Sequence, residues 1–350
     1  MARPARDHAA ATLTDQDLVA TLRACADPVR VAILRLLAED AFAVQELCQI
    51  LEVGQPNLSH HLKLMSEAGL LSAHRDGTRT FYRRALPAAD HAGAAVHDAL
   101  LATLDAAPLS LLLQQRRAAV FEARAVRSHA FFARHADAFD RNQDLIAAPR
   151  AYLPVLAAML PPAVERGLEL GPGTGEFLPL MAHRCRDVVA LDASPAMLER
   201  ARERCREAGL DNVSLRCGEL PALGHPLRDA ALAEPFDVIV LAMVLHHVPD
   251  PRALLARATA LLADGGVLLV AELCPHTQDW VEEACGDVWR GFDPEQLSGW
   301  TNALGLDDDA RQFLALRNGF RIQLRRFTTV HTTRTRQLNQ IRGDNPDEHP

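Results

Sequence analysis

The stretch Glu169-Leu-Gly-Pro-Gly-Thr-Gly-Glu-Phe combines a carboxylate with glycines at 171, 173 and 175. Glycines allow a ligand to approach the backbone closely. The spacing is G-x-G-x-G, one residue shorter than the dinucleotide pattern, and no Gly-Lys-Ser/Thr follows, which excludes a Walker-type phosphate loop. A helix is expected to start near Glu176, so the amides of the loop would favour a ligand carboxylate. Glu169 would meet an ammonium group.

A second acid stands at the position that suits a ribose. Asp192 ends the apolar run VVALDAS and lies 17 residues after Gly175 (192 − 175). In a βαβ unit, an acid at the end of the second strand is placed to hydrogen-bond both ribose hydroxyls. A carboxylate and an ammonium at one end and a ribose at the other describe S-adenosylmethionine.

The elements that would position these residues alternate between strand and helix from about residue 151. The expected strands are AVERGLEL, VVALDAS, NVSLRCGEL, FDVIVLAMV and GGVLLVAEL. Strands separated by helices predict a parallel, doubly wound α/β sheet, whose ligands bind at the carboxyl ends of the strands. RQFLALR and FRIQLRRF flank Asn318-Gly319, a hairpin signal that predicts two further antiparallel strands.

Residues 165–273 resemble class I S-adenosylmethionine-dependent methyltransferases through ELGPGTGEF, VVALDAS, GEL, FDVIVLAMVLHHVPDP and LLADGGVLLVAE. The resemblance implies a Rossmann-like seven-stranded fold. It also implies that Glu169, Gly171 and Gly173 lie near the methionine part of S-adenosylmethionine or S-adenosylhomocysteine, Asp192 on the ribose, and Glu219 with Leu220 beside the adenine. The complete set of expected cofactor contacts is Glu169, Gly171, Gly173, Gly175, Asp192, Ala193, Met197, Gly218, Glu219, Leu220 and Ala242.

The catalytic residues stay open at this stage. His246 and His247 follow the fourth expected strand, where a general base could stand. The same pair also suits a purely structural loop, and methyl transfer can proceed by positioning alone. The sequence therefore offers these two histidines as candidates and leaves the catalytic residues unassigned.

The first hundred residues have a different pattern, of short helices closed by a hairpin. Asp27-Pro28 is a helix start, because Asp caps the first amides and Pro needs no donor there. Further helices are expected to open at Val44 and to run from Gln55 to about Ala68, before Gly69. Asp76-Gly77 predicts a two-residue hairpin. Three helices and a hairpin predict a winged helix-turn-helix.

The third of these helices has one apolar and one polar face. Leu58, His61, Leu62 and Met65 follow the spacing i, i+3, i+4, i+7 and would face the core, with His61 as a hydrogen-bonded core histidine. The side chains left outward can read base edges or contact phosphates; they are Gln55, Asn57, Ser59, His60 and Lys63.

The expected wing, residues 70–84, is basic. It carries Arg75, Arg79, Arg83 and Arg84 against Asp76, a balance of 4 − 1 = +3. Such a tip beside a recognition helix favours groove or phosphate contact. Arg75 and Arg79 are the wing residues expected to contact DNA.

Residues 18–86 resemble the ArsR/SmtB family of bacterial repressors through CADPVRVAILRLL, QPNLSHHLKLMSEAGLL and DGTRTFYR. The resemblance implies a homodimer on an inverted repeat of double-stranded DNA, ligand-controlled release, and a dimer helix at about 87–104. The arsenic site of the family needs Cys-Val-Cys, and this chain has Ala43 and Gln45 there. The other metal site of the family needs Asp and His at helical spacing on the dimer helix. There His91 and His97 are six residues apart, so they pair poorly on one helical face. No metal site is expected, so the signal must enter elsewhere.

Composition sets the outer bounds. The chain has 350 residues, which favours two domains, and a net charge of −8, so any surface for nucleic acid must be local. Its 7 cysteines are scattered and fit free thiols in a reducing compartment. Without a membrane-length apolar run or a signal-peptide pattern, a cytoplasmic protein is expected. The predicted division is a flexible tail (1–14), a winged-helix and dimerisation domain (15–105), a helical connector or lid (106–150), a methyltransferase-like domain (151–330) and a disordered tail (331–350).

Two functions remain. The favoured one is a transcriptional repressor whose methyltransferase-like domain senses S-adenosylmethionine or S-adenosylhomocysteine and controls methionine-cycle genes. The alternative is a working methyltransferase of a small molecule or an arsenical, with an autoregulatory DNA-binding module.

Overall fold

The computed structural model describes residues 14–38, 40–76, 79–85, 94–220, 229–278 and 280–329. The two predicted tails therefore lie outside the described residues, apart from Thr14. The same holds for Gly77 at the wing tip and for His91. The chain divides into two compact units, Met1–Ala123 and Arg124–Pro350, which are considered separately below.

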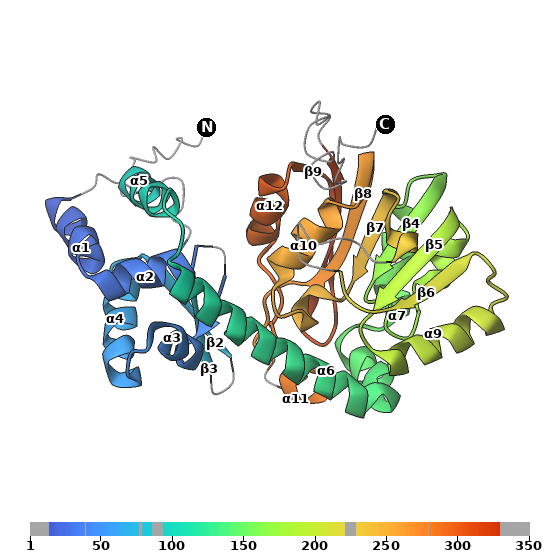
Figure 1. Cartoon of the computed structure of the whole chain (residues 1–350), viewed down its shortest axis with the longest axis horizontal. Helices are drawn as coiled ribbons and strands as arrows, with labels where there is room; N and C mark the ends of the chain where they lie inside the picture. Colours follow the sequence, from blue (N-terminus) through green and yellow to red (C-terminus); the bar gives the residue numbers. More distant parts are fainter. Residues whose placement is uncertain are drawn as a thin grey trace, which may run out of the picture. The chain divides into compact units, whose positions relative to one another are not determined.

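The first unit is the predicted winged helix-turn-helix (Figure 1). Its hairpin strands pair from Leu71↔Arg84 to Asp76↔Arg79, and β1 joins them in the order β1-β3-β2. Its elements are α1 (Asp15–Cys25), α2 (Pro28–Leu36), β1 (Phe42–Ala43), α3 (Val44–Leu51), α4 (Gln55–Glu67), β2 (Leu71–Asp76), β3 (Arg79–Arg84) and α5 (Ala94–Asp105).

Local sequence explains how these helices begin and end. The Asp27 carboxylate accepts hydrogen bonds from the amides of Val29 and Arg30, as the predicted cap requires. Gly69 follows α4 with a φ of 72°, a backbone conformation that favours glycine. The apolar face of α4 is buried as predicted, since Leu58, Leu62 and Met65 have no exposed surface.

Helix α6 (Leu111–Ala147) belongs to both units, because the division falls between Ala123 and Arg124. Its first part packs in the core of the first unit, where Val120 is buried and the Phe121 ring lies 5.6 Å from that of Phe42. Arg117 adds a 2.8 Å ion pair to Asp40. The predicted connector of residues 106–150 thus contains one 37-residue helix. Among the described residues, no helix is long and apolar enough to cross a membrane.

The second unit is built on a seven-stranded sheet in the order β6-β5-β4-β7-β8-β10-β9. β4 to β8 are parallel, while β10 runs antiparallel to both β8 and β9, as the Asn318-Gly319 hairpin predicted. This confirms the predicted Rossmann-like fold. The strands are β4 (Val164–Leu170), β5 (Cys185–Asp192), β6 (Val213–Cys217), β7 (Phe236–Ala242), β8 (Leu262–Leu273), β9 (Leu306–Ala315) and β10 (Arg321–Thr329).

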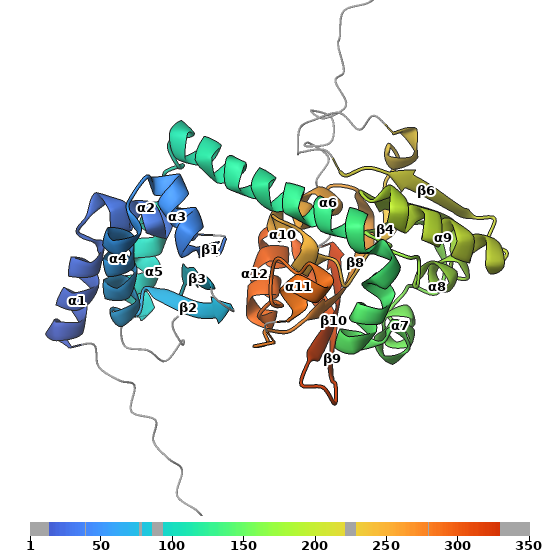
Figure 2. The same cartoon turned by 90° about the horizontal axis from the view of Figure 1, so that it is seen from below.

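Both faces of this sheet are covered, which is why its central strands are continuous apolar runs. Along β5, Val188 and Ala190 belong to one buried cluster, whereas Val189 and Leu191 belong to the other. The face with Val188 and Ala190 is covered by α7 (Pro149–Ala158), α8 (Leu178–Ala182) and α9 (Pro195–Glu207), and the face with Val189 and Leu191 by α10 (Pro251–Thr259) and α12 (Pro294–Ala303) (Figures 1 and 2). The unit also contains α11 (Val281–Cys285) and two short 3₁₀ turns, η1 (Ala230–Leu232) and η2 (Leu245–His247).

Candidate functional site

The glycine loop joins the end of β4 to α8, and its three glycines all have positive φ: 66° at Gly171, 55° at Gly173 and 81° at Gly175. They differ in what surrounds them. A Cβ at Gly171 would lie 2.9 Å from the side chain of Val244, and one at Gly175 would lie 3.1 Å from the backbone of Ala201. A Cβ at Gly173 would meet nothing within 4 Å. Gly171 and Gly175 thus permit close packing inside the protein, and Gly173 has open space beside it.

The amides of these three glycines donate hydrogen bonds within the protein, so the expected carboxylate contact would fall to the other amides of the loop. The Gly171 N–H donates to the Leu191 carbonyl at 2.9 Å and the Gly175 N–H to the Pro172 carbonyl at 2.8 Å. The Gly173 N–H donates to Oδ2 of Asp192 at 3.0 Å. The loop is therefore held in shape by its own hydrogen bonds, and a ligand would approach it through the open side at Gly173.

Glu169 lies in the middle of the sheet, beside Ala190 on β5 and Val240 on β7, and is 2 % exposed. Its Oε2 is buried and has no hydrogen-bond partner among the described residues. Burial, reinforced by the charge of Asp192, raises the pKa of Glu169 to about 8. A buried carboxylate without a donor is costly, so this position is complementary to a cationic group such as an ammonium.

Asp192 ends β5 on the neighbouring strand and is half-buried. Its Oδ2 accepts from Gly173 and its Oδ1 accepts from the Ser194 amide at 2.8 Å. These two bonds fix the carboxylate plane. The carboxylate is thus pre-oriented at the edge where a ribose diol is expected.

The remaining predicted contacts follow the ends of the adjacent parallel strands, and Met197 lies in the first turn of α9 after β5. Gly218 follows β6 and donates its amide to the carbonyl of Asp192 at 2.9 Å. Leu220 and Met197 are buried, whereas Glu219 is exposed, and Ala193 and Ala242 are half-buried. Because all these strands are parallel, their carboxyl ends meet at one edge of the sheet. The structure gathers the predicted residues there.

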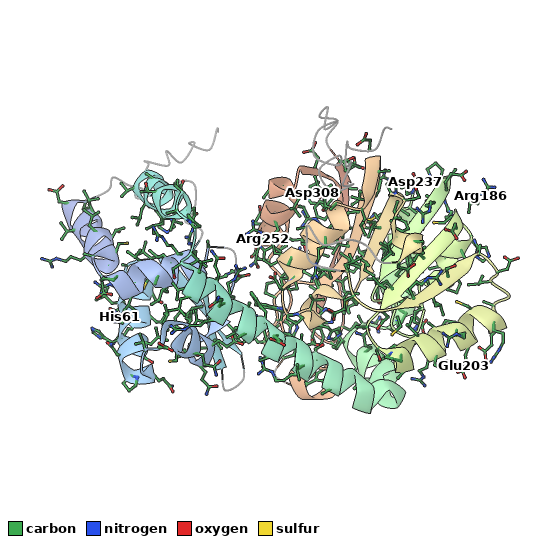
Figure 3. The ribbon with its side chains drawn as sticks, in the orientation of Figure 1. His61, Arg186, Glu203, Asp237, Arg252 and Asp308 are labelled. Atoms are coloured by element: carbon green, nitrogen blue, oxygen red, sulfur yellow. The ribbon has the colours of Figure 1, made fainter. Side chains whose placement is uncertain are left out.

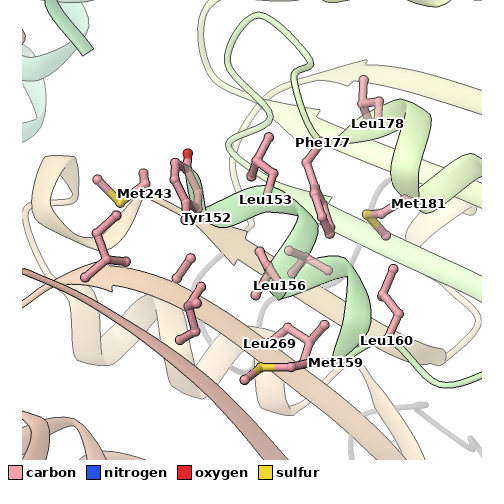
Figure 4. Packing of buried hydrophobic residues seen from close by; sticks show 14 of the residues in the cluster. Tyr152, Leu153, Leu156, Met159, Leu160, Phe177, Leu178, Met181, Met243 and Leu269 are labelled. Carbon is pink, nitrogen blue, oxygen red and sulfur yellow. The ribbon is translucent and has the colours of Figure 1, made fainter. Parts of the chain in front are cut away.

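Tyr152 of α7 was not predicted from the sequence. Its side chain is 4 % exposed, and burial, with a contribution from the charge of Glu169, raises the pKa of its phenol. Tyr152 and Leu153 pack beside Phe177, the residue before α8 (Figure 4). An aromatic in a helix before the first strand carries no sequence signal that would place it near Glu169.

His246 and His247 lie in η2, after β7, and both are buried. Nδ1 of His246 is 2.6 Å from Oε1 of Glu272, at the end of β8, and the His246 amide donates to Oε2 at 3.2 Å. Burial alone lowers the pKa of His246, but the charges of Glu272 and Asp287 outweigh it and raise that pKa to about 9. Burial, together with the charge of His246, holds the pKa of His247 well below its usual range.

Asp287 and Glu272 therefore complete a buried polar cluster that the sequence did not predict. Oδ1 of Asp287 lies 3.9 Å from Nε2 of His246 and 3.6 Å from Nδ1 of His247. Glu272 stands at a strand end, where the same rule that found Asp192 could have found it. Asp287 lies in an irregular segment after α11, and no pattern marks it.

The candidate DNA-reading helix of the first unit is α4. Gln55, Asn57, Ser59, His60 and Lys63 are all exposed, on the side opposite the buried apolar residues. His61, labelled in Figure 3, is 7 % exposed, and its Nδ1 lies 3.3 Å from Nη1 of Arg30. It is therefore the hydrogen-bonded core histidine that the sequence predicted.

The wing is less basic than its sequence indicated. Arg84 is buried, pairs with both carboxylate oxygens of Asp105 at 2.6 and 2.8 Å, and donates to the Leu34 carbonyl at 2.7 Å. It fixes the base of the wing to α5 and α2, so it does not belong with the predicted phosphate contacts. The side chains of Arg75 and Arg79 lie outside the described part of the wing.

Comparison with known proteins supports both the methyltransferase-like part and the winged-helix part of this chain. A family model for a methyltransferase domain matches residues 139–317, and a model for bacterial regulatory proteins of the arsR family matches residues 27–73. The fold and the site thus define a winged-helix DNA-binding module joined to an S-adenosylmethionine-dependent methyltransferase domain. The chain belongs to the methyltransferase-domain family, and its N-terminal module is an ArsR-type domain.

The curated relatives match part of this chain. A ubiquinone biosynthesis O-methyltransferase from Methylococcus capsulatus is 30% identical over 158 residues, which cover 41% of this chain and 64% of the relative. A trans-aconitate 2-methyltransferase from Methylobacterium radiotolerans is 39% identical over 137 residues, covering 38% and 46%. This chain thus spans less than two thirds of either relative. Among solved structures, the N-methyltransferase NodS from Bradyrhizobium japonicum in complex with S-adenosyl-L-homocysteine is 22% identical, with a TM-score of 0.45, and the match covers 58% of this chain and 98% of that one.

Proposed function

We propose that this protein is a transcriptional regulator, a homodimeric and cytoplasmic repressor, whose methyltransferase domain binds S-adenosylmethionine or S-adenosylhomocysteine as an effector. Methionine-cycle genes are the proposed targets, on operators with inverted repeats. The observation on which the proposal rests is a pre-oriented adenosyl-ligand edge in the same chain as an ArsR-type module that lacks the family's cysteine ligands.

The residues at this edge fit the ligand. Glu169 would hold the α-ammonium, because its buried Oε2 has no other partner among the described residues. Asp192 would accept both ribose hydroxyls, and Gly173 would leave room for the chain between them. The adenine would lie against Leu220, with Glu219 beside it. When bound, S-adenosylmethionine supplies an electrophilic methyl group.

Helix α6 supports a route from this edge to the DNA-binding module. In the second unit, the Ser128 hydroxyl donates to the His247 carbonyl at 3.2 Å and Arg124 donates to the Pro249 carbonyl at 3.4 Å. Arg124 also lies 4.7 Å over the Trp289 ring. The loop after β7, which lies next to Gly171, is thus hydrogen-bonded to α6. Residues earlier in the same helix, such as Val120, pack in the core of the first unit.

For regulation, the ligand must bind the DNA-competent and DNA-incompetent states with different affinity. The test starts by selecting duplexes from a random library with the purified full chain. A selected duplex is then titrated with the protein, with S-adenosylmethionine or S-adenosylhomocysteine added. We expect one ligand to change DNA affinity by at least fivefold and DNA to change the affinity for that ligand by the same factor, because linkage is reciprocal. Equal DNA affinity with and without both ligands contradicts the sensor function.

The second candidate function is methyl transfer to a small molecule or an arsenical, and His247 is the observation that favours it. Its depressed pKa keeps it neutral near pH 7, as a general base requires, whereas His246 is protonated there. Incubation with labelled S-adenosylmethionine and a panel of hydroxyl, amine and arsenite acceptors tests this function. Turnover that His247→Gln abolishes supports it, and labelled product at the same rate in His247→Gln excludes His247 as the base.

A further inference from the structure

The buried cluster after β7 has the composition of a metal site. His246, His247 and Asp287 each offer one ligand atom, and these atoms all lie within 4.8 Å of one another. The two histidines come from η2, and Asp287 comes from the segment after α11. All three side chains are buried. We propose that these residues form a binding site for one divalent transition-metal ion of the Zn²⁺ type.

The spacing of the donor atoms fits such an ion. Zn²⁺ binds imidazole nitrogens and carboxylate oxygens at about 2.0–2.2 Å, which places two ligands of a tetrahedral site about 3.4 Å apart. Oδ1 of Asp287 is 3.6 Å from Nδ1 of His247 and 3.9 Å from Nε2 of His246. All three ligand atoms lie within 4.8 Å of one another, so the side chains would draw together as the ion binds.

Glu272 provides the outer support that metal-bound histidines commonly have. A histidine ligand usually donates its second ring N–H to a carboxylate, which fixes the ring and its tautomer. Nδ1 of His246 is 2.6 Å from Oε1 of Glu272, and that oxygen also accepts from the Leu273 amide. Nε2 of His246, on the other side of the ring, is fully buried and makes no hydrogen bond to any described residue. This nitrogen is therefore placed to coordinate an ion.

The donor set and the charge indicate the class of ion. Two imidazoles and one carboxylate suit Zn²⁺ and related ions, whereas Mg²⁺ and Ca²⁺ prefer oxygen ligands. The carboxylates of Asp287 and Glu272 would balance a charge of +2 in a buried place. Three protein ligands leave a fourth position for water or for a donor atom of a small molecule. The site does not depend on the proposed sensor function. It requires both histidines to be neutral, and it excludes His247 as a general base, because the one lone pair of its neutral ring would bind the ion.

The alternative is a metal-free cluster, in which protonated His246 bridges Glu272 and Asp287. The first arrangement binds a transition-metal ion, whereas the metal-free cluster binds none, so metal titration separates them. The full chain is treated with a chelator, dialysed, and titrated with Zn²⁺, Co²⁺ and Mg²⁺. We expect one tightly bound Zn²⁺ per chain, visible absorption bands from bound Co²⁺ without a thiolate charge-transfer band, and no competition from Mg²⁺ at a hundredfold excess.

Variants assign the ion to these residues. Asp287→Asn keeps the size of the side chain, and we expect it to weaken Zn²⁺ binding at least a hundredfold, as should His247→Gln. The controls His183→Gln and Asp264→Asn alter exposed residues and should bind like the parent. A full chain that binds no stoichiometric Zn²⁺ or Co²⁺ overturns the proposal, and so does Asp287→Asn with undiminished affinity.

Folding of the variants is followed by circular dichroism. If Asp287→Asn does not fold, the parent protein still decides the matter through the Co²⁺ spectrum and through its thermal unfolding. Nitrogen and oxygen ligation without thiolate, together with a midpoint that rises with added Zn²⁺, supports the site. A thiolate charge-transfer band assigns the ion to cysteines and overturns the proposal.

Discussion

The polar residues of α4 and those at the carboxyl edge of the sheet are arranged in opposite ways. On α4 the candidate DNA-reading side chains are exposed and the buried side chains are apolar apart from His61, so the helix presents most of its polar groups on its surface. At the sheet edge, Glu169 and His246 are buried with carboxylates as neighbours, and their pKa values are raised. A surface that reads a large polyanion needs no desolvated groups of its own, whereas a site for one small ligand gains selectivity from them. The two regions therefore should respond to different perturbations, and four experiments test this.

The largest effect is expected at Asp192. Asp192→Ala removes a pre-oriented carboxylate and should weaken S-adenosylhomocysteine binding roughly 100-fold, since hydrogen bonds to charged groups contribute about 1.5–3 kcal/mol each. Isothermal titration calorimetry measures this. Asp211→Ala, a change at an exposed acid, serves as the control and should bind normally. DNA affinity without ligand should be the same in both variants, and an equal loss of DNA binding in Asp192→Ala would mean that the two regions are not separable.

The next effect belongs to α4. Asn57→Ala should weaken binding to a selected duplex about tenfold, because a good base contact is worth about 1–3 kcal/mol. Binding to a scrambled duplex should stay the same, and so should binding of S-adenosylhomocysteine. Fluorescence anisotropy with the two duplexes measures the ratio. If both duplexes lose affinity equally, Asn57 contacts the backbone and does not read a base.

Glu169 predicts a pH dependence. Its pKa of about 8 lies above the ordinary 4.5, so the folded state without ligand holds a proton that the unfolded state loses earlier. The stability associated with Glu169 is therefore fully present below about pH 4.5 and is lost as pH rises through 8. A ligand ammonium needs the ionised form, so affinity should rise with pH from 6 to 8, by at most about tenfold per unit.

At still higher pH the α-amino group of the ligand itself loses its proton, and the affinity should fall again. Glu169→Gln cannot ionise and should lack the rising part of the profile. Calorimetry at several pH values, in buffers with different ionisation enthalpies, also counts the proton released. A rising profile in Glu169→Gln would assign the titration to another group.

The smallest effect is expected at Lys63. This side chain is exposed and lies 3.8 Å from Glu67, an ion pair that contributes little to stability. Lys63→Ala should weaken binding to all duplexes alike, about threefold at moderate salt, and reduce the slope of log affinity against log salt by about 1. If Lys63→Ala lost affinity only for the selected duplex, Lys63 would contact a base, as is expected of Asn57, and would not contact a phosphate.

Much of this molecule follows from local patterns in its sequence. The Asp27 cap, the buried face of α4 and the alternating strands are short-range features, and each has the predicted structure. The candidate cofactor residues were predictable for the same reason, because a parallel sheet brings the carboxyl ends of its strands together whatever the loops do.

The environments of several charged side chains depend on packing between segments that are distant in the sequence. Arg84 reads as one more wing arginine until Asp105 and the Leu34 carbonyl enclose it. His246 and His247 were ambiguous because their protonation depends on Glu272 and Asp287, which come from other parts of the chain. The sequence by itself determined which elements form and which strand ends meet. Only the tertiary structure decided which charged groups lose their water, since desolvation depends on neighbours that no local pattern specifies.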